Sequence, residues 1–407
     1  MCEFKISRLG AAGHGIAEGP AGPVYVRGGL PGEWVLAEVS GRWGRLVHPV
    51  QPSADRVQAV CPHFGTCGGC AAQHMNATLY RSWKQEAVGA AFAHRGLEAN
   101  IAPLQPIPAG TRRRAVFTVG GGPHGARLGY REEGSHALVD IEVCPILVPA
   151  IAQALPALRE VASVALVAGA SGRMTVTATP AGLDVALDSE GLETGVAARA
   201  ALADVAERHR IARLTLNDDL VAMRAQPTLS FGGTAVALPP GAFVQAVAES
   251  EAVMTDLIRG AAGKAKRLAD LFCGIGTFTL PLARKARVLA VDGDGAAIAA
   301  LKNAALRPGL KPVEARVRDL LRAPLSPIEL ESFEAVIFDP PRAGAKAQAE
   351  ALARSRVPLV IAVSCNPATL ARDARILVEG GYCIERVVPI DQFVFSAQVE
   401  AVAILSR

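Results

Sequence analysis

The sequence predicts an α/β protein built from a small N-terminal β-barrel, a central α+β domain and a C-terminal sheet of the doubly wound type. Residues 1–52 alternate apolar and polar residues between glycine-rich turns, which is typical of a small closed, OB-like barrel. Residues 53–238 mix alternating strand patterns with alanine-rich helical ones. Residues 239–407 repeat a cycle of strand, turn and helix, which predicts a Rossmann-like parallel sheet with ligands at the carboxyl ends of its strands.

Composition sets broad limits on the class of protein. With 407 residues, the chain is long enough for several domains and a large core. Half of the residues are hydrophobic, yet no apolar run reaches membrane-spanning length, and the first ten residues, MCEFKISRLG, lack a signal-peptide core. We therefore expect a cytoplasmic protein with no membrane partner. The net charge of +4 permits nucleic-acid binding without requiring it, so any site for a polyanion must be local.

The eight cysteines include a tight triplet, Cys61, Cys67 and Cys70, in the glycine-rich stretch CPHFGTCGGC. A distant fourth, Cys144, is followed by proline. In a cytosolic chain of this length, such crowding favours a metal centre over a disulfide framework. Zinc usually takes two closely spaced pairs of ligands, whereas a three-plus-one set ending in Cys-Pro is more typical of an iron–sulfur cluster. Spacing alone leaves both open, and four unrelated thiols are the third interpretation.

A helix is predicted for residues 79–96, LYRSWKQEAVGAAFAHRG, from the helical spacing of its apolar residues. We expect this helix to pack on the C-terminal domain. Its polar face is expected to be exposed and to carry Arg81, Lys84 and Glu86.

Two strand ends in the C-terminal domain suggest a cofactor site. Residues 270–278, DLFCGIGTF, form a strand, a glycine turn and a helix, but lack the third glycine of a dinucleotide fingerprint. The next strand ends in Asp292, whose carboxylate can accept both ribose hydroxyls of a nucleoside. This arrangement suits S-adenosylmethionine, which has no pyrophosphate. A later strand ends in Asp339-Pro-Pro-Arg342, a rigid turn that faces the same crevice.

The stretch 357–373, VPLVIAVSCNPATLARD, predicts a buried strand that turns directly into a helix. Asn366 can cap that helix, and Pro367 suits its first position. The thiol of Cys365 then lies beside the positive end of the helix dipole, which favours the thiolate of a nucleophile. The alternative interpretation is a buried, inert cysteine. Cys273 is the rival nucleophile, but its place inside the cofactor turn favours a packing role.

Taken together, DLFCGIGTF, DPPR, SCNPATLARD and a Val-Glu dipeptide after a DQF segment closely resemble the RNA uracil-5-methyltransferase family, a class I group that depends on S-adenosylmethionine. The stretch CPHFGTCGGC with Cys144 is similar to the iron–sulfur motif of the family members that act on 23S rRNA. The N-terminal residues, with GHGIA and LPGE, are similar to the TRAM domain, an RNA-binding β-barrel. The resemblance spans nearly the whole chain.

The resemblance implies a role for each matching residue. It implies that Cys365 is the nucleophile and Glu400 the base that removes the ring proton. It implies that S-adenosylmethionine is bound by six residues, Gln245, Phe272, Thr277, Asp292, Asp319 and Asp339. It also implies that a [4Fe-4S] cluster is held by four cysteines, Cys61, Cys67, Cys70 and Cys144.

Three positions depart from the pattern of the family. Gln398 stands where the family usually has histidine, and Val394 where it has proline. Val247 stands where an asparagine is common. These replacements leave the core chemistry in place, but the resemblance does not determine the choice of substrate or the precise setting of Glu400.

The expected function is formation of 5-methyluridine in 23S rRNA through a covalent bond between Cys365 and the uracil ring. We therefore expect a single-stranded or loop RNA as partner, and neither DNA nor a membrane. Transfer RNA is the alternative substrate. An amino-group methyltransferase and a non-catalytic iron–sulfur protein that binds RNA are the alternatives from other classes. The sequence does not determine the oligomeric state, and a monomer is the working expectation.

Overall fold

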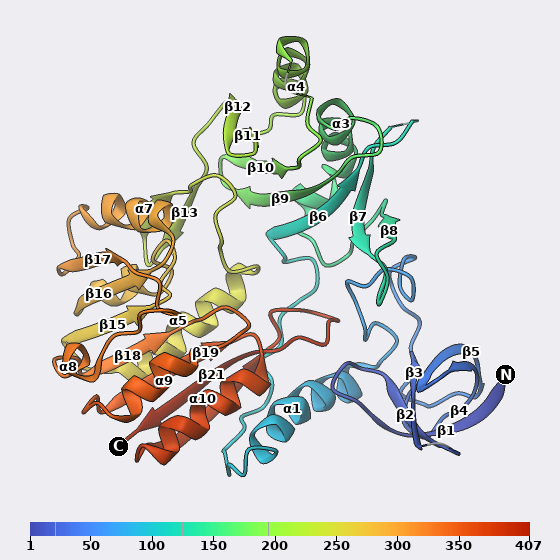
Figure 1. The fold of residues 1–407 in the computed structure, drawn as a ribbon, viewed down its shortest axis with the longest axis horizontal. Helices are drawn as coiled ribbons and strands as arrows, with labels where there is room; N and C mark the ends of the chain where they lie inside the picture. The colour runs from blue at the N-terminus through green and yellow to red at the C-terminus, as the bar shows by residue number, and fades with distance from the viewer. Residues whose placement is uncertain (21, 124, 194) are drawn as a thin grey trace.

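A computed structural model describes residues 1–20, 22–123, 125–193 and 195–407, and Figure 1 shows its arrangement. The N-terminal part is a closed barrel with strand order β1-β2-β3-β5-β4. Its strands are β1 (Cys2–Leu9), β2 (Gly15–Gly19), β3 (Gly22–Arg27), β4 (Trp34–Ser40) and β5 (Trp43–Gln51). Alternate side chains, such as Phe4, Ile6, Val24 and Val26, fill its interior because successive residues of a strand point to opposite faces. The predicted small barrel is confirmed.

The central part is a seven-stranded sheet with strand order β12-β11-β10-β9-β6-β7-β8. Its strands are β6 (Arg114–Gly120), β7 (Arg127–Arg131), β8 (Leu138–Asp140), β9 (Ser171–Thr179), β10 (Gly182–Asp188), β11 (Arg213–Leu216) and β12 (Asp219–Met223). Its helices are α2 (Pro149–Ala152), α3 (Leu155–Ala165) and α4 (Val196–Arg208), and a hairpin of β13 (Thr228–Phe231) and β14 (Thr234–Ala237) leads to the last part. A separate apolar core joins α3 and α4 to this sheet.

The C-terminal part is a second seven-stranded sheet with strand order β17-β16-β15-β18-β19-β21-β20. Its strands are β15 (Arg267–Leu271), β16 (Arg287–Asp292), β17 (Val313–Val317), β18 (Ala335–Phe338), β19 (Leu359–Ser364), β20 (Cys383–Ile390) and β21 (Glu400–Ser406). Its helices are α5 (Ala248–Ala262), α6 (Thr279–Ala283), α7 (Gly295–Ala305), α8 (Pro327–Leu330), α9 (Lys346–Ala353) and α10 (Pro367–Glu379). Among the described helices, none is long and apolar enough to cross a membrane.

The pairing within this sheet confirms the predicted Rossmann-like arrangement. Strands β15 to β19 run parallel, and β21 is inserted antiparallel between β19 and β20. Both faces of the sheet are covered: Val336 and Phe338 enter one apolar core, whereas Ala335 and Ile337 enter another. Burial on both sides explains why these strands read as continuous apolar runs.

Helix α1 (Ala77–Ala93) lies against the C-terminal part beside α10, as Figure 1 shows. The side chain of Asn76 caps its first turn, and Val88 and Phe92 enter the same core as Leu370. The helix predicted for residues 79–96 is therefore confirmed. The predicted exposure of Lys84 is wrong, because its side chain is completely buried.

Lys84 is buried because it holds the connection between β20 and β21, residues 391–399. Its ammonium group donates to Asp391 at 2.5 Å and to the carbonyls of Phe393 at 2.8 Å and Gln398 at 2.9 Å. Each of the three hydrogens of the ammonium group therefore has a hydrogen-bond acceptor, which compensates for the burial of the charge. The hydroxyl of Tyr80 adds a bond to Asp391 at 2.8 Å. Helix α1 therefore fixes the 391–399 segment from both of its ends.

We expect replacement Lys84→Met to lower the free energy of unfolding by about 3–5 kcal/mol, because it leaves Asp391 buried without its counter-charge. Urea unfolding followed by circular dichroism measures this loss. Arg81→Met is the matched control, because Arg81 is exposed on the same helix and its loss should change stability by less than about 0.5 kcal/mol. Equal stability of the Lys84 variant and the wild type would contradict this account.

Candidate active site

Five of the predicted site residues stand at the carboxyl ends of the five parallel strands. Because these strands run in the same direction, their ends meet at one edge of the sheet. Each residue ends its strand or follows it within two positions, in the order Phe272 after β15, Asp292 at the end of β16, Asp319 after β17, Asp339 after β18 and Cys365 after β19. The structure therefore brings the predicted cofactor and nucleophile positions to the same edge.

The glycine turn after β15 is shaped by backbone conformations that favour glycine. Gly274 and Gly276 have positive φ angles of 52° and 95°, and Phe272 has φ of 60°, which is rare for an aromatic residue. The carboxylate of Asp292 accepts the N–H of Gly274 and the N–H of Asp294, both at 2.8 Å. These bonds fix the carboxylate while leaving lone pairs for a ligand hydroxyl. The turn and the acidic residue thus form one unit.

Two further predicted positions lie at the same edge. Thr277 is half-buried in the glycine turn, and Asp319 is exposed. The carboxylate of Asp319 accepts the N–H of Leu321 at 3.0 Å, and the N–H of Arg318 donates to the Asp292 carbonyl at 2.8 Å. The second bond joins the ends of β16 and β17.

Cys365 lies in the turn between β19 and α10, as expected. Asn366 caps α10 by accepting the N–H of Ala368 at 3.1 Å, and Pro367 is the first residue of the helix. Burial, together with the charges of Glu400 and Asp339, raises the pKa of the Cys365 thiol to about 11. The prediction that this turn favours the thiolate is therefore wrong, because burial and two carboxylates outweigh the opposite effect of Arg342.

Glu400 is placed beside Cys365 by the register of β19 and β21. Ser364 pairs with Ala401, and the two strands are antiparallel. Cys365, which follows Ser364, therefore lies opposite Glu400, which precedes Ala401. The Glu400 side chain is only 2% exposed, and its Oε2 accepts the Nε2–H of Gln392 at 2.8 Å. Its Oε1 has no hydrogen-bond partner among the described residues. Burial and the charge of Asp339 raise the pKa of Glu400 far above its ordinary value.

Gln245 and Asp339 are hydrogen-bonded to each other. The Nε2–H of Gln245 donates to Oδ2 of Asp339 at 2.7 Å, and its Oε1 accepts from Gln392 at 2.8 Å. Burial raises the pKa of Asp339 to about 7, against the effect of the Gln245 bond. Gln245 therefore lies between a predicted cofactor position and the residue that holds Glu400.

Sequence reasoning missed the part that Gln392 has in this network. Gln392 lies in the DQF segment, which is part of the resemblance to the family, so the sequence did point to this stretch of the chain. Its partners are 147 positions away at Gln245 and eight positions away at Glu400, and no periodicity connects such positions. Only the folded chain brings them together.

The rival nucleophile Cys273 has the environment of a packing residue. It is 5% exposed and lies in an apolar core with Ile275 and Leu280. Burial and the charges of Asp270 and Asp292 raise the pKa of its thiol well above the ordinary value. The packing role predicted for Cys273 is confirmed.

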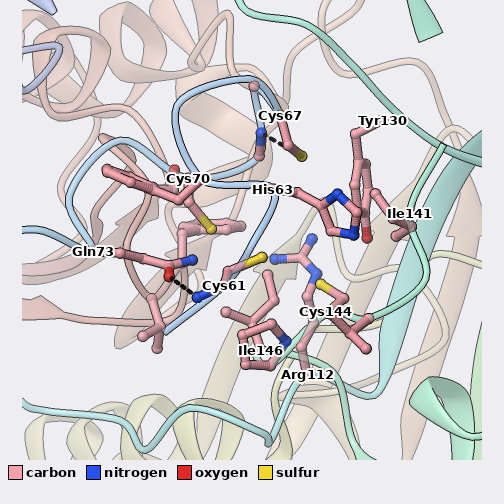
Figure 2. A pocket seen from close by; sticks show the side chains of 18 of the residues that line it. Cys61, His63, Cys67, Cys70, Gln73, Arg112, Tyr130, Ile141, Cys144 and Ile146 are labelled. Atoms are coloured by element: carbon pink, nitrogen blue, oxygen red, sulfur yellow. Dashed lines mark hydrogen bonds between the residues drawn. The ribbon is translucent and has the colours of Figure 1, made fainter. Parts of the chain in front are cut away.

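The four cysteines singled out by spacing surround one cavity of about 260 Å³, which Figure 2 shows. All four are free, and the N–H of Cys61 donates to the amide oxygen of Gln73 at 3.0 Å. Burial raises the pKa of Cys70 to about 11 and that of Cys144 to about 12. Within the described residues, no three His, Cys, Asp or Glu side chains form a group that could hold a metal ion. The other wall of the cavity includes Phe393 and Gln398 of the 391–399 segment.

Comparison with known proteins places the chain in a family. A sequence model described as tRNA (Uracil-5-)-methyltransferase matches residues 310–407. An uncharacterized RNA methyltransferase of Brucella suis is 46% identical over 408 residues, covering 100% of this chain and 98% of that protein. The 23S rRNA (uracil(1939)-C(5))-methyltransferase RlmD of Alkalilimnicola ehrlichii is 35% identical over 430 residues, covering 100% and 96%. The chain belongs to the RNA uracil-5-methyltransferase family.

A solved structure shares the fold of the whole chain. The tRNA (uracil-54, C5)-methyltransferase of Pyrococcus abyssi, solved with S-adenosyl-L-homocysteine, superposes with a TM-score of 0.76 at 22% identity, covering 99% of this chain and 100% of that one. The predicted family and the predicted S-adenosylmethionine-dependent enzyme class are confirmed. Membership in a uracil-5 family decides against the amino-group alternative. An iron–sulfur cluster is not shown by these comparisons.

The environment of Cys365 predicts a slow, strongly pH-dependent reaction with iodoacetamide. Since only the thiolate reacts, the rate should rise about tenfold per pH unit below the pKa of about 11. Glu400→Gln removes a negative charge next to the thiol, so the pKa should fall and alkylation at pH 8 should accelerate severalfold. Peptide mass spectrometry measures the rate at this residue. Glu385→Gln, an exposed change on β20, is the control, and equal acceleration in both variants would contradict the assignment.

Proposed function

We propose that this protein transfers a methyl group from S-adenosylmethionine to carbon 5 of a uridine in 23S rRNA, through a transient bond between Cys365 and carbon 6. The observation that carries the proposal is the β19–β21 register, which sets a thiol beside a buried carboxylate. The RlmD relative, 35% identical over the whole chain, favours 23S rRNA as the substrate. Transfer RNA is the second candidate, because the sequence model of the family carries that description.

The thiol is needed because carbon 5 of uracil is too weak a nucleophile to take a methyl group unaided. Addition of the Cys365 thiolate to carbon 6 turns the ring into an enolate with electron density on carbon 5. The thiol must first lose its proton, and Asp339 and Glu400 are the adjacent carboxylates. The raised pKa of Asp339, about 7, suits it to accept a proton near neutral pH.

The carboxylate of Glu400 is needed after methyl transfer. Its free oxygen, Oε1, removes the proton from carbon 5, the double bond between carbons 5 and 6 re-forms, and the Cys365 thiolate leaves with the electron pair of the carbon–sulfur bond. Burial keeps this carboxylate away from water, so its basicity is high for a glutamate.

The cofactor residues implied by the family follow the same edge of the sheet. When bound, S-adenosylmethionine supplies a methyl group on a positively charged sulfur. We assign the ribose hydroxyls to Asp292, whose carboxylate is already oriented by two backbone N–H groups. The other proposed contacts are Gln245, Phe272, Thr277, Asp319 and Asp339. Their common feature is a position at or near the carboxyl ends of β15 to β18.

We also propose that the cysteine cavity holds a [4Fe-4S] cluster. Four free, half-buried cysteines line one cavity, and their three-plus-one spacing is more typical of an iron–sulfur cluster than of zinc. Burial disfavours thiolates here, so a positive centre would have to displace the thiol protons and stabilise their charge. Such a cluster would act structurally, by tying the 61–70 loop to Cys144 of the central part.

The proposed division into domains assigns RNA binding to the barrel, residues 1–52. Residues 53–238 would carry the cysteine centre, and residues 239–407 the catalytic site. On the barrel, Trp43 is 56% exposed and its ring lies 5.4 Å from that of Tyr25. An exposed indole that packs on a second aromatic ring provides a stacking surface for an unpaired base.

The test of the function is incubation with S-adenosylmethionine and RNA that contains 5-fluorouridine. Fluorine cannot be removed as a proton, so a covalent complex of protein and RNA should accumulate. Cys365→Ala should form none, whereas Glu400→Gln should still form it with fluorinated RNA and should also accumulate it slowly with natural RNA. Denaturing gel electrophoresis and mass spectrometry detect the complex and its attachment residue.

Two substrates separate the candidate targets. Transcripts of 23S rRNA should be methylated and trapped, whereas transfer RNA should not, and the reverse result would transfer the proposal to the second candidate. Cys383→Ser, an exposed change, serves as the control for cysteine replacement. A wild-type protein that methylates RNA at carbon 5 without ever trapping would contradict the covalent mechanism.

For the cysteine centre, we expect anaerobically purified protein to contain about four iron and four sulfide ions per chain. Cys70→Ser should reduce the iron content at least by half and lower the thermal midpoint of unfolding. Cys383→Ser should change neither. Chemical iron and sulfide analysis together with visible absorption measure this, and stoichiometric zinc in place of iron would contradict the cluster.

A further inference from the structure

A completely buried amide, that of Gln392, lies at the centre of the active-site network. Its side chain is 3% exposed and joins two parts of the site. Its Nε2 donates to Oε2 of Glu400 at 2.8 Å and to Oε1 of Gln245 at 2.8 Å. Its Oε1 lies 2.5 Å from the hydroxyl of Ser250 on α5. An amide nitrogen has two hydrogens, so both are used.

The orientation of this amide is determined by its partners. An ionised Glu400 has no hydrogen to donate, so it can meet only the nitrogen of the Gln392 amide. The carbonyl of Gln392 must then face Ser250, the remaining neighbour, which has a hydroxyl to donate. Gln245 is oriented in turn, because its own nitrogen donates to Asp339 at 2.7 Å. The network therefore has one consistent direction of donation, from Gln392 through Gln245 to Asp339.

The backbone that carries Gln392 is held as firmly as its side chain. The preceding residue, Asp391, bonds to Lys84 and Tyr80 of α1, and the carbonyl of the following residue, Phe393, accepts from Lys84. Lys84 thus holds the residues on both sides of Gln392. The backbone at Gln392 is therefore fixed, and its side-chain amide has little freedom to turn. This is the condition under which a hydrogen bond can determine where a catalytic group points.

We propose that Gln392 is the positioning residue of the base: it holds Oε2 of Glu400 so that Oε1 faces the target carbon. This inference rests on the proposed function and adds a residue to it. The reasoning is that Glu400 has one occupied and one free oxygen, and that the occupied one is bound by a side chain which is itself fixed. The residue does not touch the ring and acts only through Glu400.

The step that depends on this positioning is the last one. The C5–H bond breaks, its proton passes to Oε1 of Glu400, its electrons re-form the C5–C6 double bond, and the C6–S bond breaks with its electron pair on Cys365. Two earlier steps, the addition of the Cys365 thiolate to carbon 6 and the transfer of the methyl group to carbon 5, do not use Glu400. Loss of Gln392 should therefore slow release of the adduct and leave its formation nearly unchanged.

The bond from Gln392 also lowers the pKa of Glu400, in opposition to burial and to Asp339. The other titratable neighbour is Cys365 across the β19–β21 pair, with Arg342 beside it. Without Gln392 the pKa of Glu400 should rise. The base would then be ionised only at higher pH, so the acid side of the pH profile of kcat should move upward.

The experiment compares wild type and Gln392→Met, a replacement of similar volume without an amide. We expect kcat to fall about 10-fold to 100-fold, with KM for RNA changed less than threefold. The adduct with natural, unfluorinated RNA should accumulate, and the acid limb of the profile should shift to higher pH. Ser250→Ala removes the bond to the Gln392 carbonyl, together with a local bond to the carbonyl of Val247, and should shift the same limb by less. This variant keeps the inference testable if Gln392→Met does not fold.

The matched control is Gln348→Met, because Gln348 is an equally buried glutamine whose amide bonds only to Leu325, away from the site. This control should leave kcat and the pH profile unchanged. A Gln392 variant with wild-type kcat and pH profile would overturn the inference, as would one that no longer traps fluorinated RNA. A wild-type protein that methylates no RNA would instead overturn the proposed function, and the inference with it.

Discussion

The buried pairing of Lys84 with Asp391 joins helix α1 to the segment that leads to the candidate active site. One ammonium group on α1 fixes both ends of the 391–399 segment. That segment forms one wall of the cysteine cavity and leads directly into β21, whose first residue is Glu400. A buried charge is tolerated only when its hydrogens are all accepted, so the position of this segment is closely specified. Glu400, the proposed base, consequently follows a segment that is held by a helix from the N-terminal half of the chain.

The same exclusion of water accounts for the protonation properties of the site. A charge is costly in a medium of low dielectric constant, so burial raises the pKa of Cys365, Asp339 and Glu400 together. Each ionised group makes ionisation of its neighbours harder.

The cysteine cavity and the active site share the 391–399 segment. Phe393 and Gln398 face the cavity, whereas Gln392, between the same anchors, faces Glu400. Backbone bonds from Ala71 and Ala72 to the carbonyl of Phe395 join the cysteine loop to this segment at 2.7 and 3.0 Å. The two sites are thus neighbours on one short stretch of chain. These bonds give the cysteine loop a structural role in holding the 391–399 segment.

Local patterns in the sequence were enough to predict the barrel, the parallel strands, the cap at Asn366 and the family, because each depends on residues close together in the chain. The gathering of the strand ends at one edge of the sheet also followed, since parallel strands place their carboxyl ends together. The burial of Lys84, the high pKa of Cys365 and the contacts of Gln392 could not be predicted in this way. They depend on partners eight to more than three hundred positions away, and on the dielectric environment that those partners create. The sequence by itself therefore determined which groups stand at the site, and only the tertiary structure decided their charges and orientations, because these depend on the distances between groups that the fold brings together.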